Sequence, residues 1–525
     1  MSGSAQLDRI RVVDLIDAQT ERDPDRACLI FDDVELSYRE VQRQSIALAN
    51  GLVERGIGRG AKVALLSTNH PMCVIATIAT LRAGAVWVPI NPRDSVEDIS
   101  RLLSRLTVTA LAYHSGFADR VDALIAGTDV TQCFGLDRPT AHHENLASVA
   151  ANSTSSAPPQ VDWSDDDIVA IFATGGTTGV PKGVMFANDR LVALARHWAD
   201  FGMSDGDVRR LAAAPLTHVA GRACLVGMAS GVTTVVLEQF DPVKVLDAIE
   251  QQRITAVTTP PTLLYKLLAV PDVRTRDYSS LTTIGYGAAP IALASLKEAI
   301  DVFGPVLTEG YGQTEAPLFI ARMSAAEHFG PDGRLVSDER LKSCGRPTPF
   351  ADVRILDDAG NELPTGAEGE IAVRADFVMN GYYDDPVATA AAFAGDHLRT
   401  GDIGRFDADG FLSIVGRRKE MIISGGFNVY PAEVENALAE RPEVREAAVV
   451  GEPDDVWGEV VVAYVELRGG ASADPGELHA WARARLGGVK APKRIEIVDE
   501  LPRNANGKVL KRLLTPAAAR LSEVS

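Results

Sequence analysis

The segment from Thr174 to Gly183 concentrates residue types that bind phosphate. It runs Thr-Gly-Gly-Thr-Thr-Gly-Val-Pro-Lys-Gly and follows an apolar run, residues 168–172, that is typical of a buried strand entering a turn. Glycines let backbone N–H groups point toward an anion, threonine hydroxyls add donors, and a lysine adds positive charge. The segment therefore predicts an anion-binding loop, with a flexible surface turn as the alternative.

The same residues exclude two common nucleotide loops. The usual phosphate loop needs Gly-Lys-Ser/Thr at the start of a helix, so that the hydroxyl reaches a metal ion. Here Pro181 precedes Lys182 and Gly183 follows it, and the proline biases Val180 away from helical geometry. The Gly-x-Gly-x-x-Gly pattern of dinucleotide sites is also missing from the sequence. We therefore expect no helix to begin across Lys182.

The loop resembles the Thr-Ser-Gly-Thr-Thr-Gly-x-Pro-Lys-Gly signature of adenylate-forming enzymes, the superfamily of acyl-CoA synthetases, peptide-synthetase adenylation domains and firefly luciferase. Gly175 stands where serine is usual, which removes one hydroxyl donor. The resemblance implies that Lys182 holds the β- and γ-phosphates that leave as pyrophosphate. The nucleotide-binding residues that it implies in this loop are Thr174, Gly175, Gly176, Thr177, Thr178, Gly179 and Lys182.

A second segment is Gly-Tyr-Gly-Gln-Thr-Glu and ends at Glu315. A tyrosine offers a flat ring for a base, a threonine can donate to a phosphate, and a glutamate can bind a hard cation. The segment resembles the Tyr-Gly-x-Thr-Glu motif of the superfamily. The resemblance implies that Tyr311 stacks on adenine beside Gly312, and that Thr314 is a catalytic residue that contacts the α-phosphate. It also implies that Glu315 binds Mg²⁺, with Thr174 as a second metal-binding residue.

A run of small residues, Gly287-Ala288-Ala289, comes earlier in the chain. It resembles the strand end that lines the adenine and acyl pocket in the superfamily, where small side chains let a ligand approach the backbone. Tyr286 directly precedes the run, at a position where a smaller residue is common. We expect this tyrosine to narrow the pocket or to make it more polar.

A third match combines Thr400-Gly401-Asp402 with the later Gly416-Arg417. A carboxylate can accept hydrogen bonds from both ribose hydroxyls, whereas the structural alternative for this aspartate is an Asx-turn. In the superfamily the aspartate binds the ribose and the arginine supports it. The resemblance implies these roles for Asp402 and Arg417.

A fourth match, from Leu501 to Lys508, resembles the pattern Leu-Pro-x-Thr-x-x-Gly-Lys, with Asn504 in place of the threonine. When a carboxylate attacks the α-phosphate, two anions come together, and a positioned cation stabilises the transition state more than the ground state. The resemblance implies that Lys508 is the catalytic lysine and bridges the carboxylate and the α-phosphate. The alternative is an exposed lysine in a turn.

Two short segments resemble the parts of the superfamily that rotate between reaction steps. The Arg-Arg-Lys-Glu run that contains Lys419 resembles the hinge, with this lysine at the pivot. The Ser-Gly-Gly-Phe-Asn-Val segment that follows resembles the wall of the pantetheine tunnel, which implies that Gly425, Gly426 and Phe427 bind CoA. Rotation would deliver Lys508 for the first step and withdraw it for the second.

A fifth match, Pro-Leu-Thr-His-Val-Ala-Gly, ends at Gly221. A lone histidine is more often structural, but the resemblance implies that His218 is a catalytic residue and a gate between the acyl pocket and the thiol tunnel. Arg222 follows directly, and we keep two interpretations of it: pairing with a second polar group of the substrate, or an ordinary surface or ion-paired arginine. The predicted acyl-pocket residues are Val219, Ala220, Arg222 and Tyr286.

The composition predicts a cytoplasmic protein with no stable membrane insertion. The net charge of −19 argues against general binding to nucleic acids or anionic membranes. Five scattered cysteines without a Cys-x-x-Cys pattern disfavour disulfides and zinc sites. The N-terminus lacks the apolar centre of a signal peptide, and the longest apolar stretch, from Met72, is interrupted at Arg82 and is too short to span a bilayer.

The elements that must position these residues alternate between helices and strands over most of the chain. Tyr38 to Arg55 has helical spacing, residues 62–66 predict a strand, and Met72 to Arg82 predicts a buried helix. Val353 to Arg374 predicts the β-hairpins of a smaller sheet. The pattern indicates an α/β fold of layered subdomains with a small β-barrel-like subdomain.

A new pattern of strand, glycine loop, helix and two strands begins after residue 417. The remaining length of roughly 105 residues suits one small α+β domain. We predict an N-terminal adenylate-forming domain, residues 1–417, and a mobile C-terminal domain, residues 418–525, which carries the catalytic lysine.

Five matches in the superfamily's order, over residues 10 to 515, imply an AMP-forming acyl-CoA synthetase. A small carboxylic acid and ATP with Mg²⁺ would give acyl-AMP and pyrophosphate, and the CoA thiol would then displace AMP. The alternatives are an enzyme that loads a carrier-protein phosphopantetheine, a luciferase-type oxygenase, and a catalytically silent binding protein. Medium-chain, aromatic, alicyclic and steroid-derived acids are all open as substrates. No nucleic-acid partner is expected, and a homodimer is considered.

Overall fold

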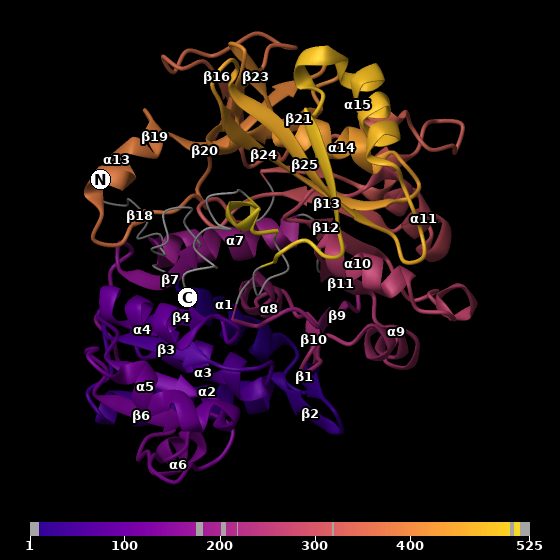
Figure 1. Cartoon of the computed structure of the whole chain (residues 1–525). Helices are drawn as coiled ribbons and strands as arrows, with labels where there is room; N and C mark the ends of the chain where they lie inside the picture. Colours follow the sequence, from indigo (N-terminus) through magenta and orange to yellow (C-terminus); the bar gives the residue numbers. More distant parts are fainter. Residues whose placement is uncertain are drawn as a thin grey trace, which may run out of the picture.

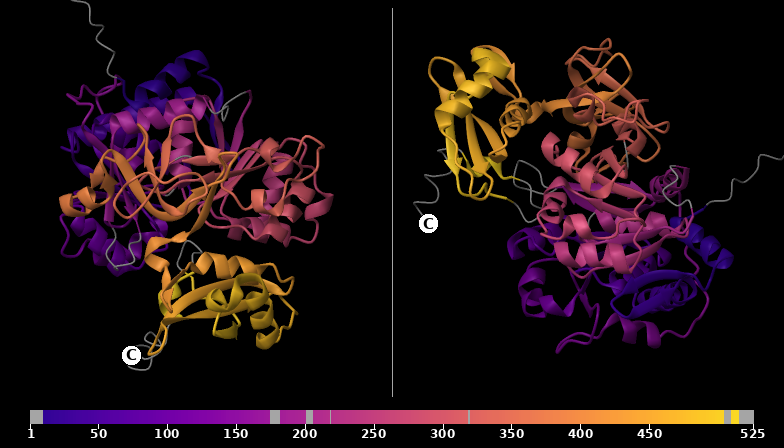
Figure 2. Two further views of the ribbon diagram at one scale, coloured as in Figure 1. Left: turned by 90° about the horizontal axis from the view of Figure 1, so that it is seen from above. Right: turned by 90° about the vertical axis from the view of Figure 1, so that its right-hand side faces the viewer.

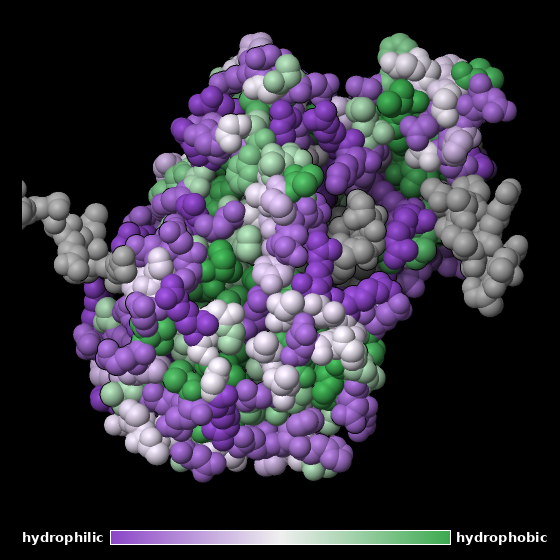
Figure 3. Space-filling model, turned by 90° about the vertical axis from the view of Figure 1, so that its left-hand side faces the viewer, coloured by the Kyte–Doolittle hydropathy of each residue, from purple (hydrophilic) through white to green (hydrophobic). Residues whose placement is uncertain are grey.

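The computed structural model shows a large body with a smaller C-terminal unit on one side (Figures 1 and 2). The described residues are 10–174, 182–200, 206–217, 219–317, 320–503 and 509–514. Within these ranges, no helix is long and apolar enough to cross a membrane. On the face shown in Figure 3, hydrophilic residues predominate and apolar residues form small groups between them.

A seven-stranded sheet forms one layer of the large body, in the order β18-β8-β7-β4-β3-β5-β6. Its central strands are parallel, whereas β8 pairs antiparallel with β7 and β18 antiparallel with β8. Continuous apolar runs, such as the fully buried β4, suit a parallel sheet that is covered on both faces. The strands are β3 (Lys62–Leu66), β4 (Val86–Ile90), β5 (Ala110–Tyr113), β6 (Gln132–Gly135), β7 (Ile168–Thr174), β8 (Lys182–Ala187) and β18 (Gly381–Tyr382).

A nine-stranded sheet forms a second layer, in the order β15-β14-β13-β12-β11-β9-β10-β1-β2. The strands from β13 to β1 are parallel neighbours, and the strands at both edges are antiparallel. The strands are β1 (Ala27–Phe31), β2 (Val34–Ser37), β9 (Arg209–Ala212), β10 (Thr233–Val236), β11 (Ala256–Thr259), β12 (Thr283–Gly287), β13 (Leu307–Tyr311), β14 (Ala321–Met323) and β15 (Arg346–Pro347).

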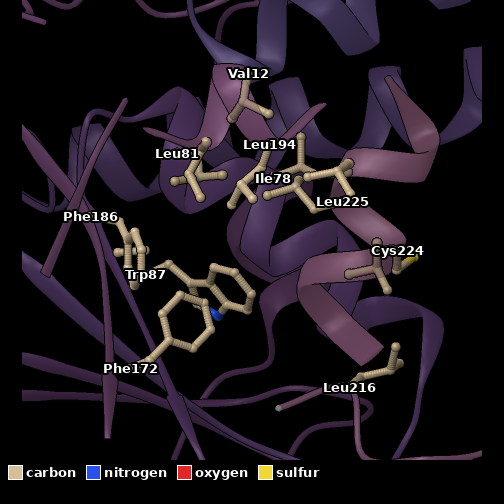
Figure 4. Close-up of a cluster of buried hydrophobic side chains, with 14 of the residues drawn as sticks. Val12, Ile78, Leu81, Trp87, Phe172, Phe186, Leu194, Leu216, Cys224 and Leu225 are labelled. Carbon is tan, nitrogen blue, oxygen red and sulfur yellow. The ribbon is translucent and has the colours of Figure 1, made fainter. Parts of the chain in front are cut away.

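Five helices form an inner layer between the two sheets. Their core cluster includes Trp87 and Phe172 from the seven-stranded sheet and Ala212 from the nine-stranded sheet (Figure 4). Helix α3 is buried on every side from Cys73 to Arg82, which confirms the predicted buried helix. The inner helices are α1 (Val12–Arg22), α2 (Tyr38–Glu54), α3 (Pro71–Arg82), α7 (Asn188–Asp200) and α8 (Val219–Met228).

The outer faces of both sheets are covered by amphipathic helices. Helix α4 begins at an N-cap, where the Ser95 side chain accepts from the Asp98 N–H, and packs its apolar face on the seven-stranded sheet. On that sheet lie α4 (Val96–Arg105) and α5 (Val121–Ile125); on the nine-stranded sheet lie α9 (Pro242–Gln251), α10 (Pro261–Leu268) and α11 (Leu293–Phe303). Three shorter helices are α6 (Leu146–Ala151), α12 (Asp338–Leu341) and α13 (Pro386–Ala391).

A third, five-stranded antiparallel sheet follows, and its first two strands form the predicted hairpin. Strand β20 pairs with β17, β19 and β21, so it is the centre of this subdomain. The strands are β16 (Asp352–Leu356), β17 (Gly369–Arg374), β19 (Phe393–Ala394), β20 (His397–Phe406) and β21 (Leu412–Arg417).

The C-terminal unit has a sheet of its own, with its helices packed against it, and stands apart from the large body in Figure 2. Helix α14 contacts β24, and α15 packs on α14. The elements are β22 (Ile422–Ser424), β23 (Phe427–Val429), α14 (Pro431–Ala439), β24 (Val444–Asp454), β25 (Gly458–Leu467), α15 (Pro475–Lys490) and β26 (Arg494–Val498). The predicted α/β fold with a small α+β C-terminal domain is confirmed.

Candidate active site

The predicted phosphate loop lies between two strands, β7 and β8, that pair antiparallel. Its two ends, Thr174 and Lys182, pair directly, and the Thr174 hydroxyl donates to the Lys182 carbonyl at 3.5 Å. Strand β8 begins at Lys182, so the prediction that no helix begins there is confirmed. Five predicted nucleotide-binding residues lie outside the described residues: Gly175, Gly176, Thr177, Thr178 and Gly179.

Tyr382 connects the phosphate loop to the Thr-Glu motif. The Lys182 ammonium lies over the Tyr382 ring, 4.4 Å from its centroid, and the Tyr382 hydroxyl donates to Glu315 Oε1 at 3.0 Å. The Met379 N–H also donates to the Glu315 carbonyl at 2.8 Å. Burial and the nearby Glu315 raise the pKa of Tyr382, so its hydroxyl remains a donor at neutral pH. The short β18 strand thus brings a lysine and a carboxylate together from distant parts of the chain.

No signal in the sequence points to Tyr382. It lies in a short Gly-Tyr-Tyr run that has no chemical spacing to Lys182 or to Glu315. Only the pairing of β18 with β8, in which Tyr382 lies opposite Val184, explains its position.

A second cluster is built around the Asp402 carboxylate, which is only 4% exposed. The Tyr311 hydroxyl donates to Oδ2 at 2.8 Å, and Arg417 Nε lies 3.0 Å from Oδ1. Burial and the charge of Asp402 raise the pKa of Tyr311 well above its usual value, so the phenol donates rather than ionises. The structure therefore brings together three residues that the sequence predicted separately. We call Tyr311, Asp402 and Arg417 the ribose cluster, after the role that the sequence predicts for Asp402.

The backbone around Asp402 is fixed by local hydrogen bonds. The Asp402 N–H donates to the Thr400 hydroxyl at 3.1 Å, and that hydroxyl donates to the Ile371 carbonyl at 2.8 Å. Gly401 has a φ of 75°, a conformation that glycine adopts without strain. Asp402 also lies directly opposite Arg417 in the β20–β21 ladder, which explains their contact.

The small-residue run ends strand β12 beside the ribose cluster's strand, β13. A Cβ atom on Gly287 would lie 2.2 Å from the Gly310 carbonyl oxygen, so no other residue fits there. Ala288 follows with a φ of 65°, and Ala288 and Ala289 are exposed. Such backbone strain is typical of ligand-binding turns.

The turn after strand β13 carries the remaining residues of the Tyr-Gly-x-Thr-Glu motif. Gly312, Thr314 and Glu315 are all partly exposed. Among the described residues, the Thr314 hydroxyl has no hydrogen-bond partner, and it is free to contact a ligand.

Helix α8 begins with the predicted acyl-pocket residues. Val219 is 46% exposed, whereas Arg222, one turn later, is only 8% exposed. A Cβ atom on Gly221 would lie 1.7 Å from the Leu216 carbonyl oxygen, so the glycine of this motif allows the helix to start against the preceding turn. His218 lies outside the described residues.

Tyr286 is not brought together with helix α8. Its side chain belongs to the core cluster on the outer face of the nine-stranded sheet, whereas α8 packs on the inner face. The Tyr286 hydroxyl lies 3.3 Å from Glu309 Oε2 and 3.1 Å from His328 Nε2. Burial raises the pKa of Glu309 to about 8. The pocket role of Tyr286 stays a prediction, and its side chain contacts Glu309 and His328 instead.

The predicted hinge lies between two sets of ion pairs. Arg418, just before Lys419, pairs with Glu370 and Asp358 of the third sheet at 2.8 and 2.7 Å. Glu420, just after it, pairs with Lys511 of the C-terminal unit at 2.9 Å. Lys419 is exposed and has no hydrogen bond or ion pair to the rest of the described chain. It is therefore the free link between a residue fixed to the large body and a residue fixed to the C-terminal unit.

The predicted CoA-binding segment is the turn between β22 and β23. Gly425 has a φ of 58°, and a Cβ atom there would lie 2.5 Å from the Trp457 ring. Gly426 has a φ of 82° with open space around it, and Phe427 is 59% exposed. The segment thus presents backbone and an aromatic ring to solvent.

Lys508 lies outside the described residues, but the base of its loop is described. Arg503 and Val509 form a β-bridge, and the Leu510 N–H donates to the Pro502 carbonyl at 2.7 Å. Arg503 pairs with Glu446 and Glu466 of the C-terminal sheet at 2.7 and 3.3 Å. The described residues on either side of Lys508 are therefore paired with each other, and Arg503 ties them to the C-terminal sheet.

Two family descriptions match the chain. Residues 16–383 match the AMP-binding enzyme family, and residues 433–508 match the AMP-binding enzyme C-terminal domain. Among the described residues, no group of three or more His, Cys, Asp or Glu side chains is placed to hold a metal ion without a ligand's help.

Individual proteins are similar over nearly the whole chain. The medium/long-chain-fatty-acid–CoA ligase FadD8 of Mycobacterium tuberculosis is 36% identical over 508 residues, 94% of this chain and 87% of the relative. The feruloyl-CoA synthase of an Amycolatopsis species is 38% identical over 484 residues, 91% of this chain and 92% of the relative. The solved amide bond synthetase McbA of Marinactinospora thermotolerans has a TM-score of 0.87 at 32% identity, over 96% of this chain and 99% of that one. The chain belongs to the AMP-binding enzyme family, within the adenylate-forming superfamily whose motifs its sequence carries.

Proposed function

We propose that the protein is an AMP-forming acyl-CoA synthetase, which uses ATP to join a small-molecule carboxylic acid to CoA. The ribose cluster carries the proposal, because it holds a buried carboxylate beside a half-exposed arginine at the end of strand β13. The relatives named as CoA ligases support the choice of acceptor.

In the first step a carboxylate oxygen of the acid attacks the α-phosphorus of ATP. The bond from that phosphorus to the bridging oxygen of the β-phosphate breaks, and pyrophosphate leaves. Lys182 neutralises the leaving pyrophosphate, and Lys508 stabilises the charge that develops at the α-phosphate. Asp402 holds the ribose, Tyr311 stacks on adenine, and Thr314 donates to the α-phosphate.

Glu315 fits the role of a Mg²⁺ ligand. The Tyr382 hydroxyl binds only its Oε1 atom, and among the described residues Oε2 has no partner, so one oxygen is left for a hard cation. Thr174 supplies a hydroxyl at the start of the phosphate loop as the second protein ligand. Bound Mg²⁺ would offset the charge of the phosphates.

In the second step the CoA sulfur, after its thiol proton is lost, attacks the acyl carbonyl carbon, and the bond to AMP breaks. The C-terminal domain, residues 418–525, turns about Lys419 so that Gly425, Gly426 and Phe427 line the path of the pantetheine arm. His218 separates this path from the acyl pocket. The exposure of Phe427 supports this step, because covering an exposed aromatic ring removes a large apolar surface from water, which is favourable.

A carrier-protein phosphopantetheine presents the same thiol arm as CoA and remains the alternative acceptor. A silent binding protein is disfavoured, because Lys182, Glu315, Asp402 and Lys508 are all present. Cytoplasmic localisation and a homodimeric state remain predictions from the sequence alone.

The test is a panel of aliphatic, aromatic and alicyclic acids, assayed for ATP–pyrophosphate exchange without a thiol and then for AMP release with CoA. We expect exchange with at least one acid, and release of AMP with acyl-CoA when CoA is added. Exchange followed by transfer only to a phosphopantetheinylated carrier protein would favour the alternative acceptor. ADP as the product, or no exchange with any acid, would contradict the proposal.

A further inference from the structure

Two arginines are buried in the large body without a carboxylate partner. Arg210 is 4% exposed and Arg222 is 8% exposed, and neither forms an ion pair within the described residues. Burial lowers the pKa of each guanidinium to about 10, which leaves both charged at neutral pH. A buried charge without a counter-ion is costly, so each arginine calls for an explanation.

The two arginines lie on opposite sides of the inner helical layer. The Arg222 guanidinium lies over Phe172 and Phe186 of the seven-stranded sheet, 4.8 and 5.9 Å from their ring centroids. Figure 4 shows these rings across the cluster from Cys224. Cys224, two residues along α8 from Arg222, points instead to the nine-stranded sheet, where its thiol lies 3.6 Å from the Thr234 hydroxyl.

Arg210 lies on the inner face of the nine-stranded sheet, together with the predicted pocket glycine Gly287. Arg210 pairs with Ala256 in the ladder, Thr258 follows two residues later, and Thr258 pairs with Gly285. Residues two apart on a strand share a face. The neighbours Val257, Ile284 and Tyr286 point to the outer face and belong to its core cluster.

Solvent reaches this inner face in the middle of the sheet. Strand β11 has neighbours on both sides, yet Thr258 is exposed, and Gly285 beside it is only half-buried. A Cβ atom on Gly285 would meet nothing closer than the Thr258 side chain, at 3.4 Å. The space over Thr258 and Gly285 is therefore open, and it lies next to the small-residue run that ends β12. We call it the inner-face hollow.

The hydrogen-bond donor that faces the inner-face hollow is the Thr258 hydroxyl, which Arg210 polarises. Arg210 Nη1 donates to the Thr258 hydroxyl oxygen at 2.9 Å, so the Thr258 hydroxyl hydrogen is free to donate in turn, and it has no acceptor among the described residues. Arg210 Nε is buried without a partner. The Trp198 ring lies 4.6 Å from the guanidinium, and its own Nε1 is likewise buried and unpartnered in the described structure. Each such buried donor in a native protein calls for an explanation, and a ligand acceptor in the adjoining hollow is one.

We propose that Thr258 and Arg210 form the far end of the acyl pocket and receive an oxygen acceptor, a carbonyl or a carboxylate, on the acid substrate. The inference rests on the proposed function and narrows its substrate class to acids with a second oxygen group distant from the reacting carboxylate. A site built to donate a hydrogen bond rejects the analogue without the acceptor, because the donor is then left buried and unpaired.

The test uses three series of acids from butanoic to dodecanoic length: the plain acid, its methyl-ketone analogue with the carbonyl at the penultimate carbon, and the α,ω-dicarboxylic acid. The measurement is kcat/KM for AMP release at saturating ATP and CoA. For the wild type we expect one oxygenated acid to exceed the plain acid of equal length by about 10- to 100-fold, the range for a charge-assisted hydrogen bond. The ketone and dicarboxylate series decide whether the acceptor is neutral or charged.

Thr258→Val and Arg210→Met remove the donor and the charge behind it. We expect each to bring the ratio of oxygenated to plain acid close to one. Arg222→Met tests the other buried arginine as the rival partner of the substrate oxygen. Arg253→Met, which removes a surface arginine paired with Asp277, is the matched control and should keep the wild-type ratio. Stabilisation of each variant by ATP in a thermal melt checks that its fold is intact.

The outcomes separate this inference from the proposed function. Two outcomes would overturn the role of Thr258 and Arg210 and leave the synthetase assignment intact. In the first, the wild type uses plain and oxygenated acids equally. In the second, the ratio of oxygenated to plain acid falls in Arg222→Met but not in Arg210→Met. No AMP release with any acid would overturn both.

Discussion

The ribose cluster and the turn that carries Gly426 and Phe427 differ in how far their residues are already paired with the rest of the protein. Asp402 is already bound by Tyr311 and Arg417 and is 4% exposed, whereas Phe427, on the C-terminal unit, is 59% exposed and Gly426 faces open space. The nucleotide region is thus prearranged by hydrogen bonds within the large body. The predicted CoA-binding turn is open on the C-terminal unit, and the proposed rotation of that unit would bring a second surface over it.

This contrast predicts that changes in the large body affect nucleotide binding in both steps, and that changes in the C-terminal unit separate the steps. The free position of Lys419 between the pairs of Arg418 and of Glu420 supports the separation. Preorganised groups cost no rearrangement when they act, while mobile ones can serve two reactions in turn.

The largest effect is expected for Lys508→Ala. Loss of the cation that meets the α-phosphate should lower acyl-AMP formation by about 1,000-fold, the scale of a removed charge-stabilising donor. Thioester formation from supplied acyl-AMP and CoA should remain largely intact, because that step forms no new phosphate bond. Single-turnover assays of the two half-reactions measure this.

Arg503→Met is the matched variant for Lys508→Ala, because it changes a residue that flanks the same segment. It removes the pairs with Glu446 and Glu466 but leaves the Lys508 ammonium, so we expect a smaller, selective loss in the first half-reaction. Pyrophosphate exchange at the wild-type rate in Lys508→Ala would contradict the division of labour.

The next effect is expected for Asp402→Asn. The change removes the charge that Arg417 pairs with and an acceptor for the ribose hydroxyls, so kcat/KM for ATP should fall by about 30- to 100-fold. Tyr311→Phe keeps the ring and removes only the hydroxyl that donates to Asp402, and should cost about 5- to 10-fold.

Equal losses in Asp402→Asn and Tyr311→Phe would mean that the hydroxyl, rather than the carboxylate, sets nucleotide affinity. Titration of ATP against each variant by calorimetry separates a loss of binding from a loss of turnover.

The fold class and the contact between Asp402 and Arg417 were predictable because local sequence carries them. Alternating strand and helix patterns predicted the layers, and the Asp402 and Arg417 motifs are opposite one another in a single hairpin, β20–β21. Asp402 and Tyr311, by contrast, meet only through tertiary packing. Only the resemblance to the superfamily predicted that both residues bind the nucleotide.

The roles of Tyr382, Thr258 and Arg210 were not predictable from spacing. Tyr382 reaches Lys182 through a two-residue strand added to the edge of the hairpin, and Arg210 reaches Thr258 across two neighbouring parallel strands. The direction of the side chain also decides which of the two buried arginines, Arg210 or Arg222, faces the nine-stranded sheet. Sequence order placed Arg222 beside the motif, but helical geometry turns it toward the seven-stranded sheet.

A moderate effect is expected for Lys419→Pro. Proline fixes φ at the pivot, so the rotation that exposes the CoA path should be hindered, and thioester formation should fall by about 10-fold or more while acyl-AMP formation is spared. Lys419→Ala keeps φ free and should behave like the wild type in both half-reactions. Equal loss of both steps in Lys419→Pro would count against a hinge at this residue.

The smallest effect, on stability rather than rate, concerns a partly buried carboxyl close to the ribose cluster. Desolvation raises the pKa of Glu309 from the ordinary 4.5 to about 8, while its carboxylate accepts from the Tyr286 hydroxyl and faces the Cys344 thiol. The folded state therefore holds a proton that the unfolded state releases between these values. Stability should fall as pH rises from about 4.5 to about 8, and the loss is complete above the folded pKa.

Glu309→Gln keeps an acceptor for Tyr286 and removes the titration, so its Tm should exceed that of the wild type by on the order of 5 °C at alkaline pH and match it in mild acid. Glu435 in the C-terminal unit is the matched control, because it is also partly buried but lies 2.8 Å from the Lys511 ammonium. Glu435→Gln weakens that pair and should lower Tm at every pH, since a partly buried cation then loses one of its two carboxylates. Melting curves of both variants across the pH range test the contrast between the two units. A Glu309→Gln protein that is less stable than the wild type at alkaline pH would show that Glu309 is ionised and paired in the folded state.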